Sequence, residues 1–129
     1  MKRMMRKQTH LRIINDQRGV PTTTDFLADI TIKLVNLCQQ CNDEMPQLIH
    51  AVPDGATSWF GFANHIRDRL MQQDHTAELA FIEPIQSSEF EQAAKRPSNS
   101  IMANDLLQLC LGQQVGNWED WHDRLYGGK

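Results

Sequence analysis

Long apolar runs are missing from this sequence, which excludes several ways of meeting a membrane. No stretch approaches the ~20 apolar residues that a membrane-spanning helix requires. The basic start has an apolar run no longer than Met4-Met5, whereas a signal peptide needs a continuous apolar core of roughly 7–15 residues. We therefore interpret this start, with the cations Lys2, Arg3, Arg6 and Lys7, as the polar face of a helix end.

Cysteine is scarce, and neither sign of charge is in large excess. Three cysteines, an odd number without a signal peptide, indicate a reduced cytoplasmic protein. A formal net charge of −3 argues against a general nucleic-acid binder. Hydrophobic residues make up 40% of the chain, enough for a globular core. Residues 1–129 are therefore expected to form one domain or part of one.

Common catalytic motifs are also absent, and the cysteines do not replace them. The sequence has no Gly-x-Ser-x-Gly elbow, phosphate loop or His-Glu-x-x-His helix. Cys38-x-x-Cys41 could be a redox pair or half of a zinc site. It falls at the C-terminal end of a predicted helix, where the dipole does not lower a thiol pKa, and zinc would need two further ligands. Core thiols are the favoured interpretation, so no metal site is predicted.

Short strands alternate with helices, which indicates an α/β fold. The first nine residues read as the end of a helix. Strands are predicted at Leu11–Ile14, Gln47–Val52 and Leu79–Ile82, and helices from Thr23 or Thr24 to about Gln40, from Thr57 or Ser58 to about His75, from Asn104 to Gly112, and after Asn117. Three short strands make a poor sheet alone, so we expect missing sheet neighbours and marginal stability.

Several residues are assigned to the core from their spacing. Helical periodicity predicts buried faces that include Leu27, Ile30, Leu34, Leu37, Cys41, Trp59, Ala63, Ile66, Leu70, Trp118, Trp121 and Leu125. His50 falls within the apolar 47–52 segment, which favours a buried, hydrogen-bonded histidine over a catalytic one.

Four landmarks, in this order, resemble the dTDP-4-dehydrorhamnose reductase family of extended short-chain dehydrogenases. The first is Asp16-Gln17-x-Gly19-x-Pro21-Thr22 with Leu27-Ala28-Asp29, and the second is a predicted strand with His50 before Gly55-x-Thr57-Ser58-Trp59. The third is Pro84-Ile85 with Ser87-Ser88-Glu89-Phe90. The fourth is Arg96-Pro97-x-Asn99-Ser100, which is followed by a leucine-rich helix, Gly112 and a final helix led by Trp118. The resemblance runs from about Met1 to Tyr126. It implies that residues 1–129 are a single partial domain, the C-terminal substrate-binding region of a Rossmann-type sugar-nucleotide reductase, without the N-terminal nucleotide-binding half.

The family's chemistry does not map onto these residues. The resemblance implies NADPH or NADH on a glycine-rich turn and a Tyr-x-x-x-Lys pair that delivers the proton. The sequence has no Gly-x-x-Gly-x-x-Gly, and its one tyrosine, Tyr126, has no lysine four residues later. We therefore expect no catalytic residue and no bound cofactor from this chain.

The resemblance places Arg96 at the nucleotide-sugar pocket. A guanidinium suits a diphosphate, although Arg96 could instead be structural and pair with Glu83 or Glu89. Pro97 would fix the following backbone, and Asn99 could contact the ligand or cap a helix. Gln17 and Arg18 lie on a predicted loop at the ligand rim. Related epimerases carry a basic residue near the position of Arg18, whereas rhamnose reductases more often carry an apolar or aromatic one. Asp16 reads as a turn former.

Three functions remain open from the sequence. One is the substrate-binding part of a reductase, with a nucleotide sugar as ligand. Another is a non-catalytic regulatory subunit, because residues near Gln17-Arg18-Gly19 and Arg96-Pro97 also resemble the methionine adenosyltransferase regulatory protein. The last is a reductase assembled with a complementary chain that carries the nucleotide-binding half. Oligomers are compatible with all three, and no nucleic acid or membrane partner is expected.

Overall fold

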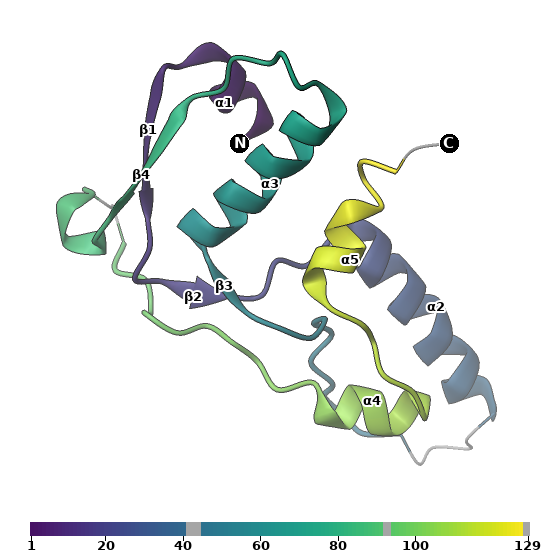
Figure 1. The fold of residues 1–129 in the computed structure, drawn as a ribbon. Coiled ribbons are helices and arrows are strands. Elements are labelled where there is room, and N and C mark those ends of the chain that lie inside the picture. Colours follow the sequence, from purple (N-terminus) through teal and green to yellow (C-terminus); the bar gives the residue numbers. More distant parts are fainter. Residues whose placement is uncertain (41–44, 92–93, 128–129) are drawn as a thin grey trace. The chain divides into compact units, whose positions relative to one another are not determined.

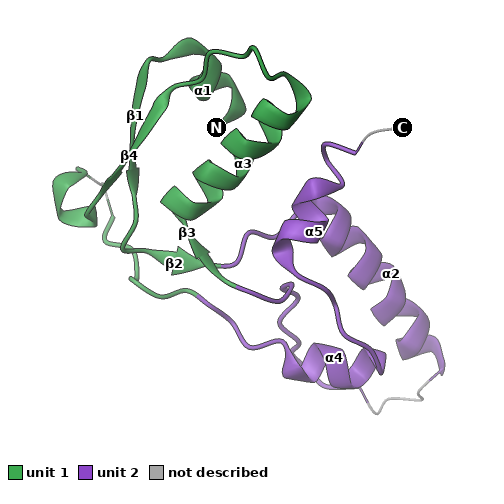
Figure 2. Ribbon diagram, viewed as in Figure 1, with its two compact units in different colours: residues 1–19, 56–100 green, residues 20–55, 101–129 purple. Residues whose placement is uncertain are grey.

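The computed structural model describes residues 1–40, 45–91 and 94–127. The chain divides into two compact units, each built from two separate stretches of sequence (Figure 2). Unit 1 comprises residues 1–19 and 56–100, and unit 2 comprises residues 20–55 and 101–129. No helix in the described part of the chain is long and apolar enough to cross a membrane.

Unit 1 is a small α/β unit (Figure 1). Its elements are α1 (Lys2–Lys7), β1 (His10–Ile14), β2 (Arg18–Gly19), β3 (Thr57–Ser58), α3 (Trp59–Gln73), β4 (Phe81–Ile85) and the 3-10 turn η1 (Ser87–Glu89). Strands β1 and β4 pair in parallel, from His10 opposite Phe81 to Ile14 opposite Ile85. Helix α3 packs against both strands and against α1. The α/β prediction is therefore confirmed.

One face of the β1–β4 pair forms the core of unit 1. Leu11 and Ile82 are paired in register, so they point to the same side, and both are buried. The α3 side chains Ala63, Ile66 and Leu70 are buried too, as predicted from their helical spacing. The strand predicted at Leu11–Ile14 is confirmed, and it has a parallel neighbour within the chain.

Strand β4 lies further along the chain than the predicted strand Leu79–Ile82. It runs from Phe81 to Ile85 and includes Pro84. The predicted strand ends before Pro84, a residue that cannot donate a ladder hydrogen bond. Among the described strands β4 pairs with β1 alone, so it is an edge strand, where a missing N–H is tolerated.

Helix α3 begins at the predicted capping residue. The Ser58 hydroxyl accepts a hydrogen bond from the Gly61 amide at 3.0 Å, which satisfies one of the free N–H groups of the first turn. Trp59, however, is 45% exposed, so the prediction that it lines the inner face is wrong. As the first residue of the helix, it lies one turn before Ala63, where the buried face begins.

Unit 2 is helical (Figure 2). It contains α2 (Thr24–Gln40), α4 (Asp105–Leu111) and α5 (Trp118–Asp123) around a core of Phe26, Ile30, Leu107, Val115 and Trp121. The rings of Phe26 and Trp121 meet edge to face with centroids 5.1 Å apart. Trp118 is also buried, as predicted, whereas Leu27 and Leu125 are exposed, contrary to prediction.

Asp54 joins the segment before β3 to the helices of unit 2. Its Oδ1 accepts hydrogen bonds from Asn104 Nδ2 at 2.8 Å and Gln108 Nε2 at 3.1 Å. The Trp118 amide donates to the Asp54 carbonyl at 3.0 Å. α4 begins after Asn104, but the Asn104 side chain is used in this network and makes no capping bond. Gly112 ends the helix with a left-handed φ of 63°, as expected.

Residues 47–52 do not form the predicted strand. This segment is irregular, with Leu48 73% exposed and His50 also exposed. The prediction of a buried histidine is therefore wrong. Within this run Val52 is buried, and Ile49 and Ala51 are partly buried against the core of unit 2. The core-thiol interpretation is wrong for Cys38, which is exposed, and Cys41 lies outside the described residues.

Candidate ligand-binding site

Three segments far apart in sequence meet at β2, within unit 1. On one side β2 pairs antiparallel with β3, so that Arg18 faces Ser58 and Gly19 faces Thr57. On the other side the Arg18 amide donates to the Ser98 carbonyl at 2.8 Å, and the Ser100 amide donates to the Arg18 carbonyl at 2.9 Å. Arg18 and Asn99 thereby form a parallel bridge. The two sequence landmarks are thus joined through their backbones.

The pairing register decides which side chains share a face. Residues directly opposite each other in a sheet point to the same side. The side chain of Arg18 therefore projects on the same side as those of Asn99 and Ser58. The side chains of Thr57 and Ser100, which flank Gly19, project on the other side. A Cβ on Gly19 would lie 2.9 Å from Ser100 Oγ, which confirms how closely these segments approach. The structure thus brings together the two predicted site residues Arg18 and Asn99.

Arg96 and Pro97 lead into this paired segment, and both are exposed. The alternative structural role for Arg96, an ion pair with Glu83 or Glu89, is not observed. Glu83 instead contacts His10 at 2.9 Å, and Glu89 binds Arg12 at 3.1 Å. Across the described ranges, no ion pair engages the Arg96 guanidinium, so its donors face solvent beside the β2 segment.

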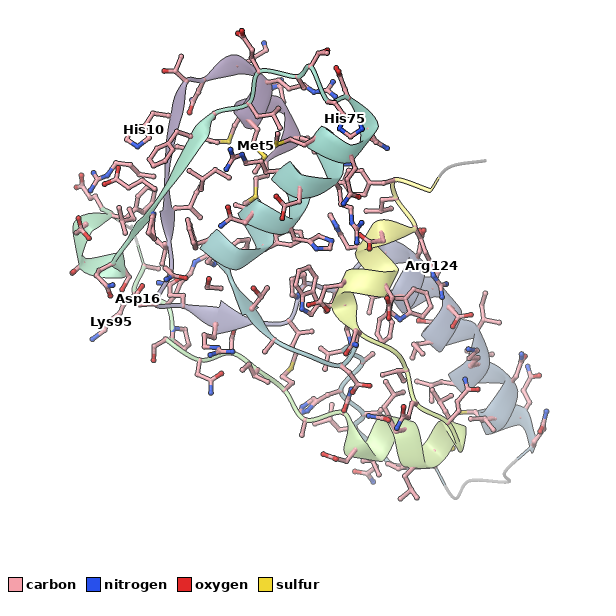
Figure 3. All side chains as sticks on the ribbon, in the orientation of Figure 1. Met5, His10, Asp16, His75, Lys95 and Arg124 are labelled. Carbon is pink, nitrogen blue, oxygen red and sulfur yellow. The ribbon has the colours of Figure 1, made fainter. Side chains whose placement is uncertain are left out.

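Gln17 and Asp16 precede β2 and lie deeper than expected of a loop rim. Gln17 is only 7% exposed. Asp16 binds Ser87, whose hydroxyl donates to Oδ2 at 2.7 Å and whose amide donates to Oδ1 at 2.9 Å (Figure 3 labels Asp16). The Ser87 hydroxyl bond is the main cause that lowers the pKa of Asp16 below its ordinary value. These contacts fix the backbone from which Arg18 projects.

The electrostatics of the site favour an anion. Arg18, Lys95 and Arg96 are exposed cations on the two joined segments, and Asp16, which precedes β2, is already bonded to Ser87. Guanidinium groups bind phosphate oxygens through paired N–H donors. Asn99 adds a side chain that can both donate and accept. The arrangement can hold a phosphorylated ligand.

Sequence reasoning missed Ser58 and Asn15 as parts of this site. Ser58 Oγ donates to Asn15 Oδ1 at 2.6 Å, which links β3 to the turn before β2. From the sequence, Ser58 is a candidate helix cap and part of the landmark Gly55-x-Thr57-Ser58-Trp59. No local signal could have shown its second role, because the pairing of Arg18 with Ser58 joins residues 40 positions apart.

The glycines do not form a cradle for a dinucleotide. At Gly61 a Cβ would collide with Thr57 Oγ1, so the space freed by this glycine is filled by the protein's own side chain. At Gly55, with φ of 85°, a Cβ would lie 3.0 Å from the Trp118 ring. A diphosphate needs such space empty at a helix N-terminus. Neither Gly55 nor Gly61 therefore leaves the space that a dinucleotide phosphate would need.

Known proteins similar to this chain include curated reductases. Curated dTDP-4-dehydrorhamnose reductases from Salmonella typhimurium and Burkholderia thailandensis are each 29% identical to the chain, over 119 and 123 residues. Each alignment covers 92% of this chain but only 40% and 41% of the relative. The chain thus spans about two fifths of the length of these relatives.

Solved structures show the same correspondence. The dTDP-4-dehydrorhamnose reductase of Bacillus anthracis, solved in complex with NADP, superposes with a TM-score of 0.77 at 25% identity, over 97% of this chain and 40% of that one. The Clostridium acetobutylicum reductase gives a TM-score of 0.74 at 26% identity, over 91% and 38%. The fold is therefore that of part of these enzymes. A family model described as the RmlD substrate binding domain matches residues 1–126, and the chain belongs to that family.

Proposed function

We propose that this chain binds a nucleotide-diphosphate sugar, of the dTDP-linked type, as the substrate-binding part of a dTDP-4-dehydrorhamnose reductase. Arg18 and Arg96 contact the diphosphate, and Asn99 contacts the ligand from the same face of the small sheet. Pro97 fixes the backbone between Arg96 and Asn99. Gln17, which is buried, supports the β2 segment from inside unit 1.

The Arg18–Asn99 bridge is the observation that carries this proposal. It places a guanidinium and an amide on one face, directly after the Arg96-Pro97 segment. A diphosphate carries charge that two such cations match, and backbone hydrogen bonds hold the spacing before the ligand arrives. Membership of a substrate-binding-domain family supports the same role.

Hydride transfer is a separate requirement. The family reaction needs a nicotinamide cofactor to supply hydride and an acid to protonate the oxygen, and the sequence has neither the glycine-rich turn nor the Tyr-x-x-x-Lys pair that the resemblance implies for these roles. We propose that those groups come from outside these 129 residues, whether on the same polypeptide or on another chain. With NADPH and dTDP-4-dehydrorhamnose, the 129-residue chain alone is expected to give no turnover. Clear turnover would overturn this division of roles.

Calorimetric titration with a dTDP-sugar tests the binding role. Each of Arg18→Ala and Arg96→Ala is expected to weaken binding by about tenfold to a hundredfold, since a hydrogen bond to a charged group contributes about 1.5–3 kcal/mol. Arg69→Ala is a matched control from the same unit, because Arg69 lies on α3 and its guanidinium binds Gln72 at 2.7 Å. Unchanged affinity in both site variants would refute the diphosphate assignment.

A further inference from the structure

A second cationic feature lies away from β2, at the contact of α1 with α3. Lys2, Arg3, Arg6 and Lys7 of α1, with Leu70 and Gln73 of α3, line a hollow of about 440 Å³. We call this the α1 hollow. Its four cations come from six consecutive residues of a chain whose formal net charge is −3. Unit 1 as a whole carries ten lysines and arginines against seven acidic residues, whereas unit 2 carries three against nine.

The framework of the α1 hollow is fixed by packing. Met5 is fully buried, and its carbonyl accepts a hydrogen bond from the Ala80 amide at 2.9 Å (Figure 3 labels Met5). Leu70, only 2% exposed, supplies an apolar wall. With Met5 held inward, the cations occupy the remaining side of α1. Residues three and four apart share a helix face, so Arg3 lies beside both Arg6 and Lys7.

The charges of α1 are unfavourable to one another. Like charges four residues apart destabilise a helix, and both Lys2 with Arg6 and Arg3 with Lys7 have this spacing. In the described part of the chain no ion pair involves Arg3, Arg6 or Lys7.

One carboxylate lies near enough to interact with Arg6. The pKa of Asp74 is lowered, chiefly by the hydroxyl of Thr76 and to a smaller extent by the charge of Arg6. Asp74 Oδ1 accepts from Thr76 Oγ1 at 2.7 Å and is held at the end of α3. The described residues that line the hollow include four cations and no carboxylate, so the lining carries a net positive charge.

We propose that the α1 hollow is a second anion site of this protein, which takes a small ligand with two phosphate groups. Its volume falls within the range of small-molecule sites. Two guanidinium forks offer paired donors to phosphate oxygens, and the lysines add point charges. A bound polyanion would also relieve the repulsion within α1. This site is independent of the one at Arg18 and Asn99, and uses none of its residues.

Amide-resolved NMR with inorganic pyrophosphate at low salt tests the proposal on the whole 129-residue chain. Saturable shifts are expected at the amides of Arg3, Arg6, Lys7 and Gln73, with a dissociation constant of about 1 mM or tighter. The double variant Arg3→Gln with Arg6→Gln should weaken this binding by about tenfold or more. The matched double variant Arg18→Gln with Arg96→Gln removes the same charge elsewhere and should leave the α1 shifts unchanged.

The two double variants separate this proposal from the proposed function. Both sites are supported if Arg18→Gln with Arg96→Gln loses dTDP-sugar binding and Arg3→Gln with Arg6→Gln loses pyrophosphate binding at the α1 hollow. Shifts that do not saturate, or that survive Arg3→Gln with Arg6→Gln, would overturn the α1 site alone. A further experiment measures the binding of the chain to vesicles that contain phosphatidylserine. If vesicles bind through Arg3 and Arg6 while pyrophosphate does not, the cations serve a membrane surface and the small-ligand proposal is wrong.

Discussion

At the scale of single residues, the Asp16–Ser87 pair ties the site to the turn after β4. Because the Ser87 hydroxyl is the largest cause of the lowered Asp16 pKa, Ser87→Ala should move that pKa up toward its ordinary value of 3.8. NMR titration of the Asp16 carboxyl measures it. Ser88→Ala, which removes an exposed neighbouring hydroxyl, is the control and should leave the Asp16 pKa where it is.

The sign of the pH dependence follows from that direction. A carboxyl with a lower pKa in the folded state stabilises the fold above its unfolded pKa, and this contribution is lost as pH falls through the folded pKa. In the parent protein, the free energy of unfolding should therefore decrease as the pH is lowered below about 4. In Ser87→Ala, the part of this decrease that comes from Asp16 should be smaller. Identical pH profiles in the two proteins would contradict the assignment.

Gly19 and Ser100 give a second residue-scale prediction. Gly19→Ala places a methyl group 2.9 Å from Ser100 Oγ, which donates to the Arg18 carbonyl at 3.1 Å. Losing that hydrogen bond should cost about 1 kcal/mol in chemical denaturation. In a Ser100→Gly background the same substitution should cost much less, because the hydroxyl in its way is gone. Equal costs in both backgrounds would show that the two residues do not interact.

At the scale of secondary-structure elements, Ser58 serves two of them. Its hydroxyl caps α3 and also donates to Asn15 before β2. Ser58→Ala should lower the free energy of unfolding by about 1–2 kcal/mol, whereas Ser58→Thr keeps an oxygen cap and should cost less. Denaturant unfolding followed by circular dichroism measures both. A cost for Ser58→Ala no greater than for Ser88→Ala would contradict this double role.

The longer helices were predictable from sequence because their signals are local. Thr23 Oγ1 accepts from the Phe26 amide at 3.2 Å at the start of α2, and Ser58 caps α3, as the motifs indicated. The strands were harder, since pairing partners decide them. Residues 47–52 have the composition of a strand, but no described segment pairs with them. Pro84 signals a strand end, yet it is accommodated on the open edge of β4.

At the scale of the whole molecule, each unit combines an early and a late stretch of chain. The site residues could be chosen from sequence as two motifs, but their meeting could not, because the Arg18–Asn99 bridge spans residues that no spacing rule relates. Burial of Gln17 was also unpredictable, since it depends on the packing of unit 1. Family resemblance indicated the ligand class, and the backbone pairing explains how the two motifs serve one site.

The central claim is that this chain binds a nucleotide-diphosphate sugar at the β2 segment. Amide-resolved NMR of the 129-residue chain during titration with a dTDP-sugar tests it most directly. The account predicts saturable shifts at residues 17–19, 57–58 and 98–100, lost when Arg18 and Arg96 are both replaced by alanine. Absence of saturable shifts, or shifts confined to residues 20–55 and 101–127, would contradict it.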